Sequence, residues 1–150
     1  MRIVAQRVSR ASVTIDGKVR SSIGLGMMVL LGVEEADNEE DVEWLCGKLS
    51  KLRIFSDEND AMNLDIQQVQ GSFLVVSQFT LHAMTKKGNR PSFIRAARPE
   101  KAVPLYERFV ERLREISGRE VVTGEFGAMM EVELVNDGPV TIIMDSKQRE

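Results

Sequence analysis

A chain of 150 residues can bury a hydrophobic core and has the usual length of one domain, so we expect a single domain over residues 1–150. Its hydrophobic content of 43% and charged content of 29% are typical of a soluble globular protein and exclude a disordered chain. The longest apolar runs are too short to cross a membrane, and Met1 leads directly into strand-like sequence without a signal region. One cysteine, Cys46, excludes an internal disulfide. We therefore expect a cytoplasmic protein with no membrane partner.

The first third of the chain is dominated by strand-like patterns, followed by one helix. Asp16-Gly17 is a strong two-residue hairpin signal between two alternating segments. Leucines and valines at helical spacing predict a helix over residues 38–52, which Asp37 could cap. We expect strands over residues 2–10, 11–15, 18–23 and 25–33, the last of them covered on both faces.

The rest of the chain adds a second helix and further strands. Pro99 suits the beginning of a helix over residues 99–117, and Gly118 suits its end. We expect an α/β protein of mixed α+β character, with β-sheets in a barrel-like or layered β/β/α arrangement and two helices packed on the outside. The strands expected here cover residues 72–78, 121–123, 129–135 and 140–144, with short segments near 53–55 and 63–64.

Several chemistries are excluded by missing motifs. The chain has no G-x-S-x-G elbow, no P-loop and no complete dinucleotide fingerprint. One histidine and one cysteine cannot build a His/Cys zinc centre, and the carboxylates show no distinctive metal-binding spacing. We expect neither a metal nor a cofactor.

Polar residues close the apolar run 73–76 at Ser77-Gln78-Phe79-Thr80-Leu81. If the strand continues, Gln78 and Thr80 share one face, and Ser77 and Phe79 share the other. Such residues at the end of a buried strand could hold a carbonyl or amino group by hydrogen bonds. An ordinary solvated strand end is the alternative, and these residues taken alone favour it.

Residues 83–98 contain Gly88 and Pro91 without periodicity, which predicts an extended loop. Residues 83–101 carry a local net charge of +5, against −3 for the whole chain. Such a basic strip could bind a phosphate backbone, although charge alone favours a solvated loop. Its basic side chains are those of Lys86, Lys87, Arg90, Arg95, Arg98 and Lys101.

The segment 136–141 places Gly138-Pro139 between two strand-like runs, which predicts a loop tip of rigid backbone with few side-chain atoms. Such backbone could present carbonyl oxygens to a small ligand. A trans peptide is the default for a Gly-Pro bond.

The motifs 77–81 and 136–141, together with Lys87-Gly88-Asn89-Arg90-Pro91-Ser92-Phe93, resemble the D-aminoacyl-tRNA deacylase family. The resemblance runs from Met1 to Ser146, nearly the whole chain. It implies a homodimeric hydrolase that cleaves the ester between a D-amino acid and the terminal ribose of tRNA. It also implies rejection of L-aminoacyl-tRNA and acceptance of glycyl-tRNA.

The resemblance further implies roles for particular residues. By this resemblance, residues 77–81 line the substrate pocket. The Gly138-Pro139 peptide bond would be cis, and both of its carbonyls would point into the active site of the partner subunit. The implied catalytic residues are Ser77, Gln78, Phe79 and Thr80, and the implied tRNA contacts are Lys86, Lys87, Arg90 and Phe93.

The sequence leaves two mechanisms of ester hydrolysis open. Thr80 could be a covalent nucleophile, but no base is evident beside it. Alternatively, the protein positions the ester, backbone N–H groups near Phe79 and Thr80 stabilise the oxyanion, and water attacks with help from the ribose 2′-hydroxyl. We favour the second. Two other functions stay open: an esterase or amidase using Thr80 and His82, and a non-catalytic tRNA-binding module using the strip 86–101.

Overall fold

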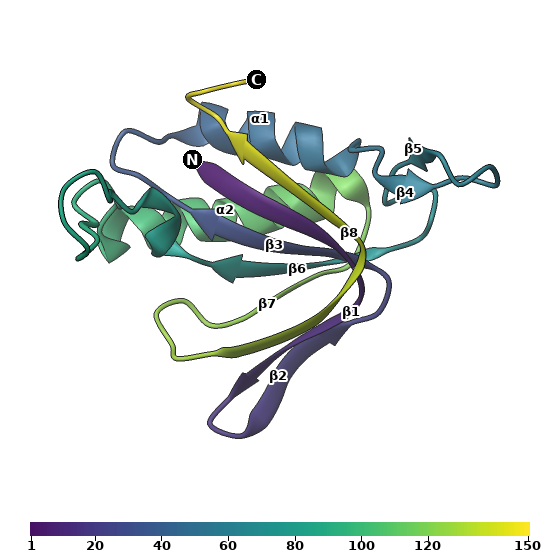
Figure 1. Cartoon of the computed structure of the whole chain (residues 1–150), viewed down its shortest axis with the longest axis horizontal. Coiled ribbons are helices and arrows are strands. Elements are labelled where there is room, and N and C mark those ends of the chain that lie inside the picture. Colours follow the sequence, from purple (N-terminus) through teal and green to yellow (C-terminus); the bar gives the residue numbers. More distant parts are fainter.

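The computed structural model describes residues 1–150, and one long strand organises its sheet (Figure 1). This strand, β1 (Arg2–Ile15), has partners on both sides. On one side it pairs first with β3 (Gly26–Gly32) and then with β2 (Lys18–Ile23). On the other side it pairs with β8 (Glu131–Asp145), and all three pairings are antiparallel.

Two parallel pairings extend the sheet beyond β3. Strand β6 (Ser72–Ser77) pairs with β3, and β7 (Val121–Thr123) pairs with β6. The Ser21 hydroxyl of β2 donates to the Thr123 carbonyl of β7, so the ends of the sheet approach each other. The result is a nearly closed mixed barrel, which confirms the expected fold class. The carboxyl ends of β3, β6 and β7 all lie at one edge of it.

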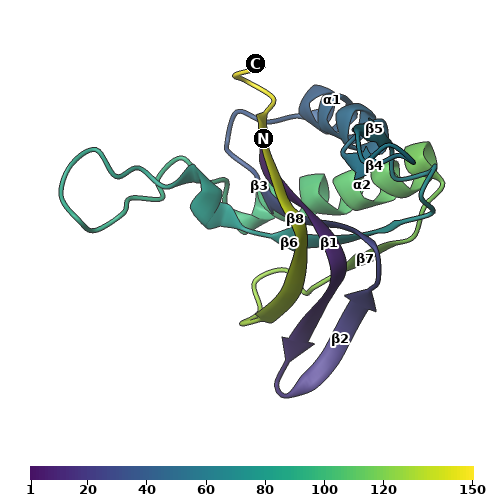
Figure 2. The same cartoon turned by 45° about the vertical axis from the view of Figure 1, so that its right-hand side comes forward.

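Helices α1 (Glu39–Ser50) and α2 (Pro99–Ser117) lie side by side over one face of the sheet (Figures 1 and 2). The main core fills the space between the helices and this face. A smaller apolar cluster fills the curled face of the sheet, inside the barrel. The main core is built around Ile3, Ala5, Val29, Leu31, Leu45, Leu49, Phe73, Val75, Phe109 and Leu113.

Three short elements complete the fold. Strands β4 (Phe55–Ser56) and β5 (Met62–Leu64) form a small hairpin, as the short strand-like segments suggested. A 3₁₀ helix, η1 (Phe79–His82), follows β6 directly. Neither α1 nor α2 has the length and apolar character needed to cross a membrane.

The helix expected over 99–117 is confirmed, and Gly118 ends it in the left-handed conformation with φ 63°. The helix expected over 38–52 begins and ends slightly inside those limits. Its cap is Asn38, whose side chain accepts from the Glu40 N–H, and not Asp37. The Asp37 carboxylate is turned inward, where it accepts from the Met1 ammonium and from the Glu34 N–H.

The expected loop tip at Gly138-Pro139 is wrong. The runs 129–135 and 140–144 belong to one strand, β8, because β1 pairs with both of them. Between the pairs Gln6–Thr141 and Val8–Asn136, β1 advances two residues while β8 advances five. Residues 137–140 therefore bulge out of a continuous strand.

Candidate active site

A mostly apolar pocket of about 350 Å³ lies where β3 and β6 end. Pockets in α/β proteins are commonly found outside the carboxyl ends of parallel strands, because the loops that follow the strands gather there. Its wall comes from these two strand ends, from the start of η1, from the first turns of α2, and from the loop between β7 and β8 with the beginning of β8. The lining residues are Leu31, Val33, Val76, Ser77, Gln78, Phe79, Ala97, Ala102, Tyr106, Phe126, Gly127, Ala128, Met129, Met130 and Val132.

Three of the four predicted catalytic residues, Ser77, Gln78 and Phe79, line this pocket. The strand expected over 72–78 ends at Ser77 and does not continue, because the backbone turns into η1. Gln78 and Thr80 nevertheless meet, since the Gln78 side-chain amide donates to the Thr80 hydroxyl. Thr80 itself is not part of the pocket wall.

The sequence reasoning missed the opposite wall, which residues 126–130 form. These residues carry no recognisable motif, and only the return of the chain from β7 to β8 brings them here. Tyr106, also missed, is a buried residue of the pocket lining. Its hydroxyl donates to the Val75 carbonyl at 2.9 Å, and burial raises the pKa of the phenol to about 12. The pocket lining therefore includes a neutral phenol whose hydrogen bond is already made.

Phe93, a predicted tRNA contact, lies against the pocket rim. Its ring meets the ring of Phe79 edge-on, with centroids 5.2 Å apart. Phe79 is 56% exposed, so this aromatic pair is open to solvent on one side. The pair joins the rim of the pocket to the loop 83–98.

The loop 83–98 is confirmed and projects from the body of the protein beyond η1 (Figure 2). Two backbone hydrogen bonds between Met84 and Ser92, at 2.8 and 3.0 Å, close its base. Lys86, Lys87 and Arg90 lie exposed beyond this bridge, and none of them pairs with an acidic side chain.

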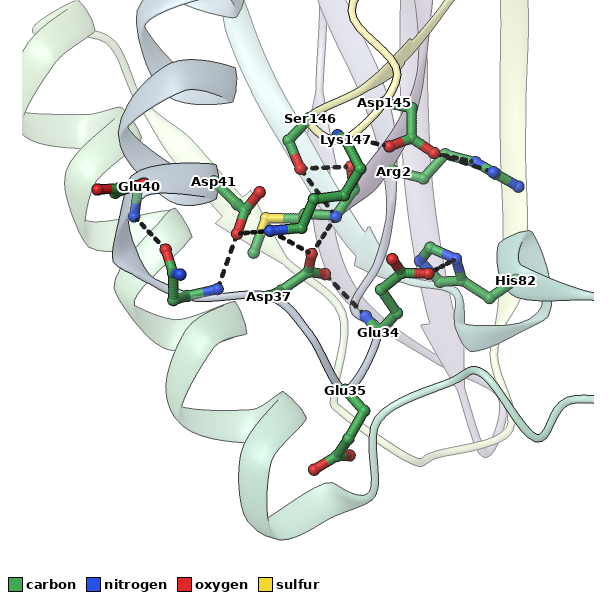
Figure 3. A network of polar contacts seen from close by, with 12 residues as sticks. Arg2, Glu34, Glu35, Asp37, Glu40, Asp41, His82, Asp145, Ser146 and Lys147 are labelled. Atoms are coloured by element: carbon green, nitrogen blue, oxygen red, sulfur yellow. Dashed lines mark hydrogen bonds and ion pairs between the residues drawn. The ribbon is translucent and has the colours of Figure 1, made fainter.

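His82 does not form the pair with Thr80 that the esterase alternative requires. His82 is 1% exposed, does not line the pocket and lies beside Glu34 (Figure 3). Burial lowers its pKa, although the backbone at Gly32 and the Glu34 carboxylate act in the opposite direction. A buried, neutral imidazole facing the interior cannot take the proton of a substrate-facing hydroxyl.

The Gly138–Pro139 peptide bond is cis, as the resemblance implied. Both residues are exposed, and neither lines the pocket of its own chain. Arg7 of β1 supports the bulge from below: its Nε donates to the Asp137 carbonyl at 2.8 Å, and its Nη1 donates to the Ile54 carbonyl at 2.7 Å. Arg7 is 8% exposed, so this guanidinium is a buried support that sequence reasoning did not find.

The comparison with family models matches residues 4–145 to the family described as D-Tyr-tRNA(Tyr) deacylase. The chain belongs to this family. Its membership makes it a hydrolase that acts on the ester bond of aminoacyl-tRNA. No three His, Cys, Asp or Glu side chains gather into a group that could hold a metal ion.

Curated relatives match over the full length of both chains. The D-aminoacyl-tRNA deacylases of Bacteroides thetaiotaomicron and Flavobacterium johnsoniae are 62% and 59% identical over 150 residues, covering 100% of each chain. The one from Akkermansia muciniphila is 60% identical with the same coverage.

Two solved structures have the same fold. The c-Myc DNA Unwinding Element Binding Protein is 41% identical, with a TM-score of 0.91 over 97% of this chain and 98% of that one. A probable eukaryotic D-amino acid tRNA deacylase matches with a TM-score of 0.80 over 95% and 97%; at 18% identity it supports the fold alone.

Proposed function

We propose that the protein hydrolyses D-aminoacyl-tRNA and glycyl-tRNA, spares L-aminoacyl-tRNA, and acts in the cytoplasm in quality control of translation. The pocket beside η1 carries the proposal, because it combines an apolar wall with Ser77, Gln78 and the start of η1 at one end. An aminoacyl ester could enter with its carbonyl near that end. The exposed Phe79–Phe93 pair and the basic loop offer contacts for the tRNA acceptor end.

Positioning and electrostatics supply the chemistry in this proposal. The N–H groups of Phe79 and Thr80 stand at the start of η1, where a helix has no internal acceptors, and no turn or loop carbonyl accepts from them. They would stabilise the oxyanion of the tetrahedral intermediate. Water attacks the ester carbon, assisted by the ribose 2′-hydroxyl. Thr80 is not the nucleophile here, since its hydroxyl bonds to Gln78 and no base lies beside it.

Chiral selection rests on exclusion. D and L substrates carry the same groups, so rigid backbone placed where an L side chain projects discriminates better than added attraction. We assign this role to the backbone of Gly138-Pro139, acting in the pocket of a partner subunit. The exposed bulge on Arg7, outside its own chain's pocket, supports this assignment. Glycine, which projects no side chain, would pass the same filter.

One assay tests the activity. Purified protein is incubated with D-tyrosyl-, L-tyrosyl- and glycyl-tRNA, and release of the amino acid is followed. We expect rapid release from the D and glycyl substrates and none above background from the L substrate. Equal turnover of the D and L forms would refute the proposal.

A heterodimer tests the partner's contribution. Two differently tagged chains are co-expressed, one with Ser77→Trp filling the pocket and the other with Gly138→Ala disturbing the bulge. If the bulge acts in the partner's pocket, the purified heterodimer keeps one intact site and hydrolyses only the D substrate. If it acts within its own chain, the only open pocket has the altered bulge, and selectivity is lost.

A further inference from the structure

His82 is the buried end of the turn that shapes the pocket. Its ring packs on Gly32, the last residue of β3, where an added Cβ would lie 3.1 Å from His82 Cδ2 and 3.0 Å from Leu81 Cβ. The Gln78 carbonyl would also lie 3.0 Å away, so a side chain at position 32 would crowd this end of η1, whereas glycine permits the close approach. The position of η1 over the end of β3 is therefore set partly by this ring.

Glu34 connects His82 to a second part of the site. Its Oε2 lies 3.3 Å from His82 Nδ1 (Figure 3). The same oxygen accepts from Arg95 Nη2 at 2.8 Å. The Glu34 N–H in turn donates to Asp37 Oδ2 at 2.8 Å, which fixes the backbone that carries this carboxylate. The carboxylate of Glu34 thus joins η1 to the end of the basic loop.

The backbone beside Glu34 belongs to the pocket wall. The Val33 carbonyl accepts from the Ala97 N–H at 2.9 Å, and Glu34 forms an antiparallel bridge with Ala96. Val33 and Ala97 both line the pocket. The backbone that carries Glu34 is therefore directly bonded to residues of the pocket wall.

A second contact holds the same end of η1. Arg2 Nη1 donates to the Leu81 carbonyl at 2.7 Å, and Arg2 is itself fixed by Asp145 through Nε at 3.0 Å. Arg2 bonds to backbone and reaches no side chain of η1. The side chain of His82 is thus what ties η1 to Glu34.

His82 is poorly suited to a role in stability alone. Neither ring nitrogen makes a hydrogen bond of good geometry, although Nδ1 lies 3.3 Å from Glu34 Oε2 and the Gly32 backbone lies close enough to favour the protonated ring. Burying such nitrogens without full partners costs free energy, which an apolar side chain of similar size would avoid. The unfavourable burial of the His82 ring occurs at the end of η1, beside the pocket. Natural proteins commonly keep such an unfavourable group where it contributes to function.

We propose that His82 is a positioning residue that, through Glu34, fixes η1 and thereby the N–H groups of Phe79 and Thr80. The inference rests on the proposed function, in which these groups receive the developing oxyanion. His82 itself does not touch the substrate. Arg95 fixes the carboxylate of Glu34 from the other side, so the end of the basic loop and the oxyanion-binding turn are held by one acid.

Three variants test the proposal by separating turnover from stability. His82→Leu should melt at the wild-type temperature or above, yet lower kcat on D-tyrosyl-tRNA about tenfold or more with KM changed less than about twofold, because displaced donors weaken transition-state binding. Glu34→Gln should also lower kcat. His82→Gln keeps a donor for Glu34 and should recover a large part of the loss.

A core variant and an activity-independent measurement complete the test. Val42→Ala in α1 removes buried apolar atoms of the main core without altering His82, Glu34 or their hydrogen-bond partners, and should lower the melting temperature while leaving kcat intact. Amide hydrogen exchange at Leu81 and Ala83, whose N–H groups donate to the Gln78 and Thr80 carbonyls, should accelerate in His82→Leu and not selectively in Val42→Ala.

The outcomes are distinguishable. Unchanged kcat in both His82→Leu and Glu34→Gln overturns the inference, as does a decrease in kcat that merely follows the melting temperature. If the wild-type protein fails to hydrolyse D-aminoacyl-tRNA, the proposed function falls, and hydrogen exchange still decides whether His82 orders the turn.

Discussion

Arg7 Nε donates to the main-chain carbonyl of Asp137 at 2.8 Å, across 130 residues of sequence. The same guanidinium donates to Ile54, so one buried side chain holds the bulge of β8 against the body of the protein. The bulge that we assign to chiral selection is thus supported by side-chain chemistry from β1.

We expect Arg7→Met to weaken discrimination between D and L substrates. The substitution leaves the Asp137 and Ile54 carbonyls without their donor and should cost about 1–3 kcal/mol of stability. The ratio of hydrolysis rates on D- and L-tyrosyl-tRNA, measured below the melting transition, checks this. Arg10→Ala is the control, because Arg10 lies on the same strand with an exposed side chain. An unchanged ratio in Arg7→Met would show that the bulge keeps its shape without this support.

Gly138→Ala should impair selectivity through local crowding. Gly138 has φ +134°, and an added Cβ would lie 3.0 Å from the Val140 backbone nitrogen and 3.1 Å from Arg7 Nη2. The backbone must shift, and small displacements at a selective site can change rates about 100-fold. Gly47→Ala, in α1 with open space around it, should leave selectivity intact and stabilise the helix by up to about 1 kcal/mol. Both variants are compared on D and L substrates.

Thr80→Ala should keep measurable hydrolysis. The Thr80 hydroxyl bonds to Gln78 and does not line the pocket, so its removal should lower kcat by no more than about tenfold. Ser77→Leu, which adds bulk inside the pocket, should be more harmful. Single-turnover kinetics compare the two. An inactive Thr80→Ala that still binds substrate, or an acyl group found on Thr80 by mass spectrometry, would establish the nucleophilic mechanism instead.

Alanine at Lys86, Lys87 and Arg90 together should weaken tRNA binding without changing chiral choice. These exposed cations have no acidic partner, and for each phosphate that is no longer neutralised, the slope of log K against log salt should become shallower by about 0.7–0.9. Binding is measured over a salt series. Alanine at Lys18 and Lys51, which are exposed on other parts of the surface, provides the control. If the triple variant binds tRNA with wild-type affinity, these three side chains are solvated and do not contact tRNA.

The stability difference between His82→Leu and the wild-type protein should grow as the pH falls. Burial lowers the pKa of His82 in the folded state, whereas the unfolded chain takes up a proton near its ordinary value of 6.5. The unfolded state therefore binds more protons below that pH, and the wild-type protein loses stability there while the leucine variant does not. Melting temperatures at pH 7.5, 6.5 and 5.5 check this. A constant difference would contradict it.

Local signals predicted the elements that depend on local chemistry. Pro99 and Gly118 marked the limits of α2, and the apolar runs marked β3 and β6. These features could be predicted because helix capping and strand burial depend on residues that are close together in the sequence. The motif at residues 77–79 was placed correctly at the end of a buried strand, which is why three of its residues line the pocket.

The errors occur where partners distant in sequence decide the structure. Gly138-Pro139 resembles a turn, yet β1 pairs with β8 on both sides of it and makes it a bulge within a strand. No local sequence pattern distinguishes Arg7 or Glu34 from other charged residues. Their roles follow from their contacts with Asp137 and His82, which are distant in the sequence. The wall at residues 126–130 follows from chain path alone.

The pocket draws its residues from β3, β6, η1, α2, the loop after β7 and β8, so no single segment contains it. Local unfolding of any one element at the protein surface leaves most of the pocket wall in place. Unfolding of the sheet, in contrast, disrupts all parts of the pocket wall together. Catalytic competence is consequently a property of the cooperative unit as a whole. Inactivation by heat should coincide with global unfolding, with no partly active intermediate preceding it.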